Sequence, residues 1–315
     1  MKALVYHGSQ DLTVEDLIEP VPQENEVRVR VAAAGLCGSD VHVIAMGALP
    51  RQPPLVLGHE FGGTLDDGRF VVVNPMMGCG QCAHCQRGST HICAKRRVIG
   101  YGTNGAFAEH IVVPHRNVVA AEGLTPLQAA LVEPLATALH AYNKAGCPTT
   151  EIAVIGAGTI GMCLLHVMQS RGARGIVVVD PVPSRRQHAL SAGAAKADAR
   201  LEGQSFQSIF DAAGTEMTRK DALASLARGA AVMLIGFHDD EMSFSATELI
   251  KNECAIVGCV AYTEAEFSEA IDLTRSMKAP WAEMLPLDEA PLAVKQILTG
   301  TAPTHRTKTI FEIAR

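Results

Sequence analysis

The sequence lacks the features that mark membrane proteins, exported proteins and nucleic-acid-binding proteins. No apolar stretch is long enough to span a membrane, and the N-terminal segment turns acidic and polar before it reaches the length of a signal peptide. No run of basic residues occurs, and 27 Lys and Arg residues against 33 Asp and Glu residues give a net charge of −6. Internal repeats and low-complexity tracts are also missing. We therefore expect a cytoplasmic protein whose partners include neither a membrane nor a nucleic acid.

The sequence does contain enough apolar residues for a large core. The 315 residues are 48% hydrophobic, and this length is typical of two domains. From Met1 to about Pro114, short β-like runs such as residues 26–35 alternate with Gly, Pro and Asn, and from about Glu151 the pattern changes. From there on, apolar runs, glycine turns and helical segments alternate, which is typical of buried parallel strands. One helix is expected over residues 125–146, with Thr125 as its N-cap and Pro126 in its first turn.

A glycine-rich turn between a predicted strand and a predicted helix indicates a dinucleotide site. Its residues are Gly156, Gly158, Thr159, Ile160 and Gly161. The first glycine permits the tight turn, the second lets the backbone approach a pyrophosphate, and the third allows close packing of helix and strand. The N–H groups at the start of the helix can then bind the phosphates. The alternative is an ordinary glycine turn in an α/β protein.

Asp180 ends the next predicted strand, which indicates the preferred nucleotide. A carboxylate at this place can accept hydrogen bonds from the hydroxyls of the adenosine ribose, and it repels a 2′-phosphate. NAD is therefore favoured over NADP. Arg185 and Arg186 act in the opposite sense, because a nearby arginine can accommodate that phosphate.

Four of the nine cysteines lie in one loop that is rich in glycine and polar residues. They follow the spacing C-x-x-C-x-x-C-x7-C at Cys79, Cys82, Cys85 and Cys93. An odd cysteine count without an export signal favours metal ligation over a disulfide framework. Four thiolates can close the coordination shell of one zinc ion, which then stabilises the loop without catalysing. His84 and His91 are then expected at the surface, and a redox disulfide or chance clustering are the alternatives.

A second set of possible metal ligands is scattered through the first half of the chain. It consists of a thiol, an imidazole and two carboxyl groups, at Cys37, His59, Glu60 and Glu133. Such a set could leave a zinc ion one open position, as catalysis requires. Taken singly, these residues have simpler interpretations, because a buried cysteine is usually an apolar filler and a His-Glu pair usually makes an ordinary hydrogen bond.

In this order, the two ligand sets and the glycine turn resemble the zinc-containing medium-chain alcohol dehydrogenases over nearly the whole chain. The segments GLCGSDVH, GHEFGG and VEPLATALHA are most similar to the sorbitol, threonine and butanediol dehydrogenase branch, which has Glu-Pro where the classical enzymes have a cysteine ligand. The resemblance implies an α/β protein. A GroES-like β-rich catalytic domain would comprise residues 1–145 and 265–315, and a Rossmann coenzyme domain with a doubly wound parallel sheet would comprise residues 146–264.

The same resemblance implies a role for each candidate ligand. Cys37 and His59 would bind a catalytic zinc ion, Glu60 would be a ligand or near-ligand, and Glu133 would be an exchangeable or water-mediated fourth partner. Because the four loop cysteines would bind a separate structural ion, two zinc ions per chain are expected.

The resemblance also implies the reaction. Ser39 and His42 would form a relay that carries the alcohol proton to solvent, while NAD accepts a hydride. The expected substrate is a secondary alcohol, a small diol or a polyol, and the expected assembly is a homodimer or homotetramer. Two alternatives stay open: an L-threonine 3-dehydrogenase, and a catalytically silent NAD-binding regulatory protein.

The chain departs from that branch at positions that concern the substrate. Val43, Val260 and Ala261 stand where sorbitol dehydrogenases carry a tyrosine, a phenylalanine and an arginine. These losses remove polar groups that could hold a polyol, so short diols or apolar secondary alcohols are expected to be better substrates than six-carbon polyols. The stretch 193–211 is also too short for a complete Rossmann crossover helix.

Overall fold

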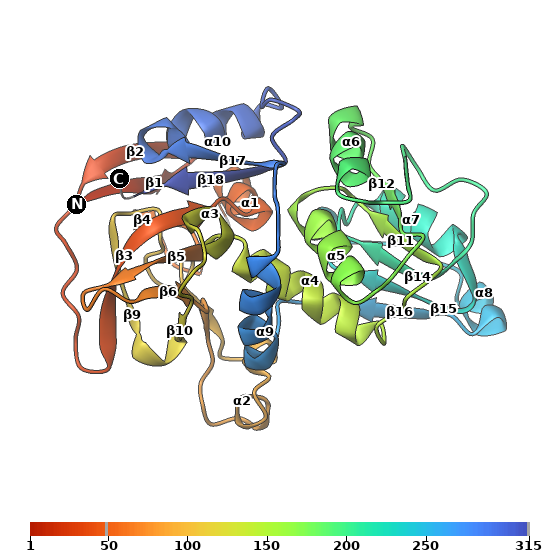
Figure 1. The fold of residues 1–315 in the computed structure, drawn as a ribbon, viewed down its shortest axis with the longest axis horizontal. Coiled ribbons are helices and arrows are strands. Elements are labelled where there is room, and N and C mark those ends of the chain that lie inside the picture. Colours follow the sequence, from red (N-terminus) through yellow and green to blue (C-terminus); the bar gives the residue numbers. More distant parts are fainter. Residues whose placement is uncertain (48–49, 314–315) are drawn as a thin grey trace. The chain divides into compact units, whose positions relative to one another are not determined.

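The computed structural model describes residues 1–47 and 50–313, which form two compact units (Figure 1). The first unit comprises residues 1–133 and 263–315, and the second comprises residues 134–262. The division falls in the first turn of helix α4 (Val132–Lys144), about one helix length before the predicted domain limit at residue 145. In the described part of the chain, no helix has both the length and the apolar character that crossing a membrane requires.

The first unit is built mainly from β-sheets. A seven-stranded sheet has the order β10-β6-β5-β3-β18-β17, and β9 pairs with β3 beside this path. These strands are β3 (Glu26–Gly35), β5 (Glu60–Leu65), β6 (Phe70–Val73), β9 (His110–Pro114), β10 (Val118–Ala120), β17 (Ala282–Pro286) and β18 (Lys308–Glu312). Strand β18 pairs antiparallel with β3, so segments from both ends of the chain share one sheet.

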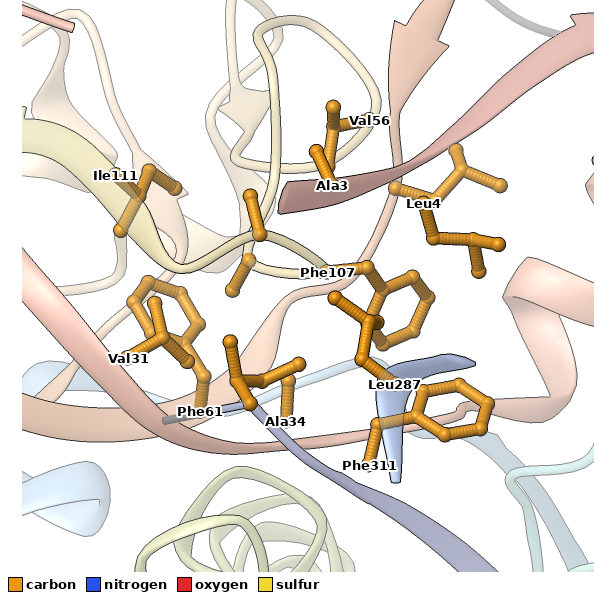
Figure 2. Close-up of a cluster of buried hydrophobic side chains, with 14 of the residues drawn as sticks. Ala3, Leu4, Val31, Ala34, Val56, Phe61, Phe107, Ile111, Leu287 and Phe311 are labelled. Atoms are coloured by element: carbon orange, nitrogen blue, oxygen red, sulfur yellow. The ribbon is translucent and has the colours of Figure 1, made fainter. Parts of the chain in front are cut away.

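A second, three-stranded sheet of the order β2-β1-β4 packs its apolar side chains into the same core. Its strands are β1 (Lys2–Gly8), β2 (Asp11–Asp16) and β4 (Leu55–Val56). Figure 2 shows Leu4 of β1 and Phe61 of β5 in one cluster with Phe107 and Phe311. The rings of Phe107 and Phe311 meet edge to face with centroids 5.2 Å apart. Removing these apolar side chains from water holds the two sheets together.

Short elements complete the first unit. A two-stranded sheet pairs β7 (Met76–Met77) with β8 (Arg97–Val98). The helices are α1 (Gly38–Met46), α2 (Ala83–Gln86), α3 (Pro126–Ala129), α9 (Glu264–Arg275) and α10 (Ala290–Leu298).

The helix predicted over residues 125–146 is in fact two helices, α3 and α4. Thr125 caps α3 as predicted: its Oγ1 accepts a hydrogen bond from the N–H of Gln128 at 3.2 Å. The prediction of a single helix was wrong because of Pro134. A proline has no N–H to donate to the carbonyl four residues earlier, which here belongs to Ala130, and its ring clashes with that carbonyl. The helix is therefore interrupted between α3 and α4.

The second unit is a parallel sheet of six strands in the order β13-β12-β11-β14-β15-β16. Its strands are β11 (Ile152–Ile155), β12 (Val177–Val179), β13 (Lys196–Asp198), β14 (Phe206–Asp211), β15 (Leu226–Leu234) and β16 (Ala255–Gly258). Its helices are α5 (Thr159–Ser170), α6 (Pro183–Ser191), α7 (Glu216–Ala224) and α8 (Ala246–Asn252). This strand order is that of the doubly wound Rossmann fold, as predicted.

The connection between β13 and β14 contains no helix, which agrees with the shortened crossover expected from the sequence. Strands β11 and β12 lie inside the sheet and are buried along their whole length. Such strands read as unbroken apolar runs.

Candidate metal and cofactor sites

The four loop cysteines of the first unit meet at one point. Their sulfur atoms all lie within 4.8 Å of one another, and all four are free thiols. The Sγ atom of Cys85 is 3.9 Å from that of Cys79 and 3.6 Å from that of Cys82. Four sulfurs at about 2.3 Å from a zinc ion form a tetrahedron with edges of about 3.8 Å. The cluster therefore fits one zinc ion with four thiolate ligands.

Short helical turns hold these cysteines. Cys82 is the N-cap of α2, and Cys93 follows the 3-10 helix Thr90–Ile92. Hydrogen bonds from the backbone N–H groups of Gln81 and Cys82 lower the pKa of Cys79 to about 6, whereas burial raises the pKa of Cys85 to about 11. The backbone thus favours a thiolate at Cys79 before any metal binds.

The prediction that both histidines of the cysteine loop lie at the surface was wrong for one of them. His84 is exposed, as expected, but His91 is buried. The 3-10 helix turns Thr90 and His91 inward and leaves the apolar side chain of Ile92 exposed instead. The burial of two polar residues and the exposure of an apolar one follow from the geometry of the 3-10 helix, so the polarity of the residues could not predict them.

A second group of ligand atoms forms where β3 ends and β5 begins. Cys37, His59 and Glu60 each offer one atom, and these atoms lie within 4.8 Å of one another. Gly35 pairs with Glu60 across the two strands, and Cys37 follows as the N-cap of α1. His59 and Glu60 are both buried. Glu133 is buried in the first turn of α4 but is not part of this group of described residues, so its role stays a prediction.

Asp40 is a residue of this site that the sequence analysis missed. It is fully buried, and its Oδ2 accepts a hydrogen bond of 3.0 Å from the N–H of Cys37. Its Oδ1 lies 3.4 Å from Nδ1 of His59. Because Nδ1 faces a carboxylate, Nε2 is the nitrogen left for a metal ion. Burial acts to lower the pKa of His59, but the charge of Asp40 and the hydrogen bonds to Asp40 and Cys37 raise it well above its usual value.

Lys308 of β18 is the second missed residue. Its ammonium group pairs with the carboxylate of Glu60 and donates a hydrogen bond of 2.9 Å to the carbonyl of Leu36. Both charged side chains are almost completely buried, at 1% and 2% exposure. Burial acts to lower the pKa of Lys308, but the charges of Glu60, Cys37 and Asp40 and the hydrogen bond to Glu60 together raise it above its usual value. Glu60 is thus shared between an ammonium group and the candidate metal position.

The third missed residue is Tyr101, which contacts both the ligand group and the predicted relay. Its ring lies against that of His59, with centroids 5.1 Å apart and a tilt of 54°. Its hydroxyl donates a hydrogen bond of 2.7 Å to Oγ of Ser39. Burial raises the pKa of Tyr101 well above its usual value, and the charges of Asp40 and Cys37 act in the same direction. Ser39 and His42 are both exposed on α1.

A close backbone contact holds His59 and Tyr101 beside each other. Each follows a glycine, Gly58 and Gly100 respectively. A Cβ atom on Gly100 would lie 2.8 Å from the carbonyl oxygen of Gly58, and the φ of Gly100 is +91°. Only glycine fits this contact, so the backbone fixes the spacing of the two rings.

The glycine turn of the second unit fits a dinucleotide. A Cβ atom on Gly158 would meet no atom within 4 Å, so the backbone faces open space there. A Cβ atom on Gly161 would lie 1.8 Å from the carbonyl oxygen of Gly156, so helix and turn are in close contact. Helix α5 begins at Thr159, and no side chain caps it. Its first N–H groups can therefore bind phosphate oxygens, with Thr159 and Ile160 in the first turn.

Asp180 stands directly after β12 and beside this turn. Its Oδ2 accepts a hydrogen bond of 2.9 Å from the N–H of Ala157, and its Oδ1 accepts one of 2.8 Å from the N–H of Val182. Nη1 of Arg185 lies 3.7 Å from Oδ2 of Asp180. The guanidinium group of Arg186 donates instead to the backbone carbonyls of Asp180 and Pro181. A carboxylate oxygen accepts more than one hydrogen bond, so Asp180 keeps capacity for a ribose hydroxyl.

Two family models match the chain. The model described as "Alcohol dehydrogenase GroES-like domain" matches residues 23–123, and the model described as "Zinc-binding dehydrogenase" matches residues 159–276. The predicted combination of a GroES-like β-rich domain with a Rossmann domain is thereby confirmed.

Similar proteins carry dehydrogenase names. The L-galactonate-5-dehydrogenase of Escherichia coli K12 is 32% identical over 296 residues, covering 85% of this chain and 86% of that protein. An L-threonine 3-dehydrogenase of Saccharopolyspora erythraea is 27% identical over 342 residues, covering 100% and 96%. A solved alcohol dehydrogenase from Escherichia coli CFT073, in complex with NADH, has the same fold with a TM-score of 0.91, 24% identity and coverage of 99% of both chains. The chain thus belongs to the zinc-containing medium-chain alcohol dehydrogenase family.

Proposed function

We propose that this chain oxidises a secondary alcohol, a small diol or a polyol with NAD as the hydride acceptor. The observation that supports the proposal is the group of Cys37, His59 and Glu60, whose ligand atoms lie within 4.8 Å of one another. Cys37 is the N-cap of helix α1, which also carries the hydroxyl group of Ser39. A thiol, an imidazole and a carboxylate form a donor set that suits zinc. A catalytically silent NAD-binding protein would have no use for such a set.

In this proposal the chain holds two zinc ions. Cys37 and His59 would hold the catalytic ion, with Glu60 as a ligand or near-ligand and Glu133 as an exchangeable or water-mediated fourth partner. A separate structural ion would be held by Cys79, Cys82, Cys85 and Cys93. The two groups share no residue, which supports a count of two. When bound, zinc lowers the pKa of an alcohol hydroxyl, and NAD takes up the hydride.

Two residues of helix α1, Ser39 and His42, would carry the proton of the alcohol to solvent. Ser39 and His42 are three positions apart on this helix, so their side chains are neighbours on its surface. Ser39 can accept the proton of the alcohol and donate its own. His42 is exposed, and an imidazole can act as a general base that passes a proton to water.

NAD is proposed over NADP because Asp180 stands where the ribose is expected. The carboxylate would accept hydrogen bonds from the ribose and repel a 2′-phosphate. Arg186 is engaged by two backbone carbonyls, which leaves Arg185 as the nearer candidate for binding a phosphate. Gly156, Gly158 and Gly161 would hold the pyrophosphate.

L-threonine remains a second candidate substrate, because a relative that aligns with the whole chain is an L-threonine 3-dehydrogenase. We also propose a homodimer or homotetramer that works in the cytoplasm. Strand β16 lies at an edge of its sheet and pairs only with β15 among the described residues. Its free backbone groups can pair with a second copy of the chain.

A substrate screen tests the proposal. Zinc-loaded protein is offered simple secondary alcohols, short diols, polyols and L-threonine, each with NAD and with NADP, and the reduced nicotinamide is followed by its absorbance. We expect oxidation of an alcohol or diol with NAD. Cys37→Ser should abolish this oxidation, whereas Cys147→Ser, at an exposed cysteine outside both groups, should leave it unchanged. Full activity of Cys37→Ser would contradict the proposed site.

A further inference from the structure

Tyr101 brings a phenol hydroxyl into the candidate catalytic site. It contacts the ring of His59 and donates to Ser39, so it touches both the metal-ligand group and the relay. The family resemblance gave Ser39 and His59 their roles but gave none to Tyr101.

The turn that carries Tyr101 is held by backbone hydrogen bonds. The N–H of Tyr101 donates to the carbonyl of Val98 at 3.1 Å, and the N–H of Gly100 donates to the carbonyl of Thr103 at 3.1 Å. The next residue, Asn104, accepts a hydrogen bond of 3.0 Å from Nη1 of Arg51. These bonds hold the backbone of the turn, and the contacts with His59 and Ser39 hold the phenol before a substrate arrives, which lowers the entropy lost on binding.

The hydrogen bond from the hydroxyl of Tyr101 to that of Ser39 determines which further hydrogen bonds each hydroxyl can make. A serine hydroxyl has one proton to donate and two lone pairs that accept. Tyr101 occupies one lone pair of Ser39, so the second remains for the hydroxyl proton of the substrate. Tyr101 has donated its only proton, so its oxygen can accept a further hydrogen bond but cannot donate one.

The spacing of the two hydroxyl oxygens matches a particular kind of substrate. Oγ of Ser39 and the hydroxyl oxygen of Tyr101 are 2.7 Å apart. The two oxygens of a vicinal diol in the gauche conformation are separated by a similar distance, that of a hydrogen bond. One hydroxyl of such a diol can donate to Ser39 while the hydroxyl on the next carbon donates to Tyr101.

We propose that Tyr101 is a specificity-determining residue, which accepts a hydrogen bond from a hydroxyl on the carbon beside the one that is oxidised. The inference rests on the proposed dehydrogenase function and narrows its substrate to a vicinal diol or polyol. It also supplies a polar group of the kind that the sequence lacks at Val43, Val260 and Ala261.

The test compares two substrates that differ in one hydroxyl, 2,3-butanediol and 2-butanol, in zinc-loaded protein with NAD. Tyr101→Phe keeps the ring against His59 and removes only the hydroxyl. We expect kcat/KM to fall about tenfold more for 2,3-butanediol than for 2-butanol, because one hydrogen bond to the substrate is lost. The difference should lie mainly in KM for the diol.

Tyr6→Phe is the matched control, because the hydroxyl of Tyr6 is buried and has no hydrogen-bond partner in the described part of the chain. It should leave the ratio of the two kcat/KM values unchanged. A second measurement does not depend on turnover. With NADH present, 2,3-butanediol should raise the thermal unfolding temperature of the wild type more than that of Tyr101→Phe, whereas 2-butanol should affect both proteins alike.

Each other outcome has a clear meaning. An equal fall for both substrates would show that Tyr101 only orients Ser39, and would overturn the recognition of the second hydroxyl. No change for either substrate would overturn it as well. In both cases the proposed dehydrogenase function would stand. A wild-type protein that oxidises no alcohol at all would overturn both proposals.

Discussion

Replacing Lys308 with methionine should destabilise the first unit strongly. Lys308 and Glu60 are exposed by only 1% and 2%, so water does not screen their charges. The substitution leaves the Glu60 carboxylate buried without its ammonium partner and removes the hydrogen bond to the carbonyl of Leu36. Breaking a buried ion pair in this way typically costs about 3 to 5 kcal/mol. We expect a loss of that size in the free energy of unfolding.

The chain contains its own probe for this measurement. Trp281 is the single tryptophan, and its carbonyl accepts hydrogen bonds from the N–H groups of Thr307 and Lys308. Its fluorescence should therefore follow the unfolding of the first unit in urea. Zinc is kept in excess throughout, so that metal loss does not add to the effect.

Two control variants separate the pair from the individual residues. Lys308→Met combined with Glu60→Met should recover most of the stability, because replacing both partners of a buried pair is often neutral or stabilising. Lys2→Met removes the cation of an exposed pair with Asp16, whose side chains are 50% and 79% exposed, and should cost at most about 1 kcal/mol. If Lys308→Met costs no more than Lys2→Met, the pair does not stabilise the fold and our reasoning is refuted.

Three further predictions concern the metal, the nucleotide and the proton. Protein purified without chelator should contain two zinc ions per chain, and a mild chelator should remove activity before structure, because an open site exchanges faster than a closed one; a zinc content near zero would contradict both sites. Asp180→Ala should weaken the use of NAD relative to NADP in parallel assays, and a wild type that strongly prefers NADP would contradict our interpretation of this residue. His42→Gln should slow oxidation about 10²-fold, most at low pH, and added imidazole should restore part of the rate if the side chain moves the proton.

Features that depend on neighbouring residues could be predicted from the sequence. The cap at Thr125 and the glycine turn each need only a few consecutive residues, and the structure contains both elements. The four-cysteine spacing was informative for the same reason, because a short loop limits how far the sulfur atoms can separate.

Features that depend on strand pairing could not be predicted. Lys308 reaches Glu60 only because β18 pairs with β3 and β3 pairs with β5, and no local pattern specifies those partners. The rings of Tyr101 and His59 are in contact because the preceding residues, Gly100 and Gly58, pack closely, and these two glycines lie far apart in the sequence. Asp40 is an intermediate case, because its position three residues after Cys37 is a known capping arrangement, whereas its contact with His59 depends on the pairing of β3 with β5.

The place of β18 in the chain has a consequence for how the protein folds during synthesis. The ribosome reaches Lys308 248 residues after Glu60, and the whole second unit is made in between. At typical rates of translation this delay is about 12 to 50 s. Throughout it, strand β18 has not been made, so the seven-stranded sheet of the first unit cannot be completed and Glu60 lacks the ammonium group of Lys308. The second unit is continuous from residue 134 to 262 and meets no such delay, so the later part of the chain can finish folding before the earlier part.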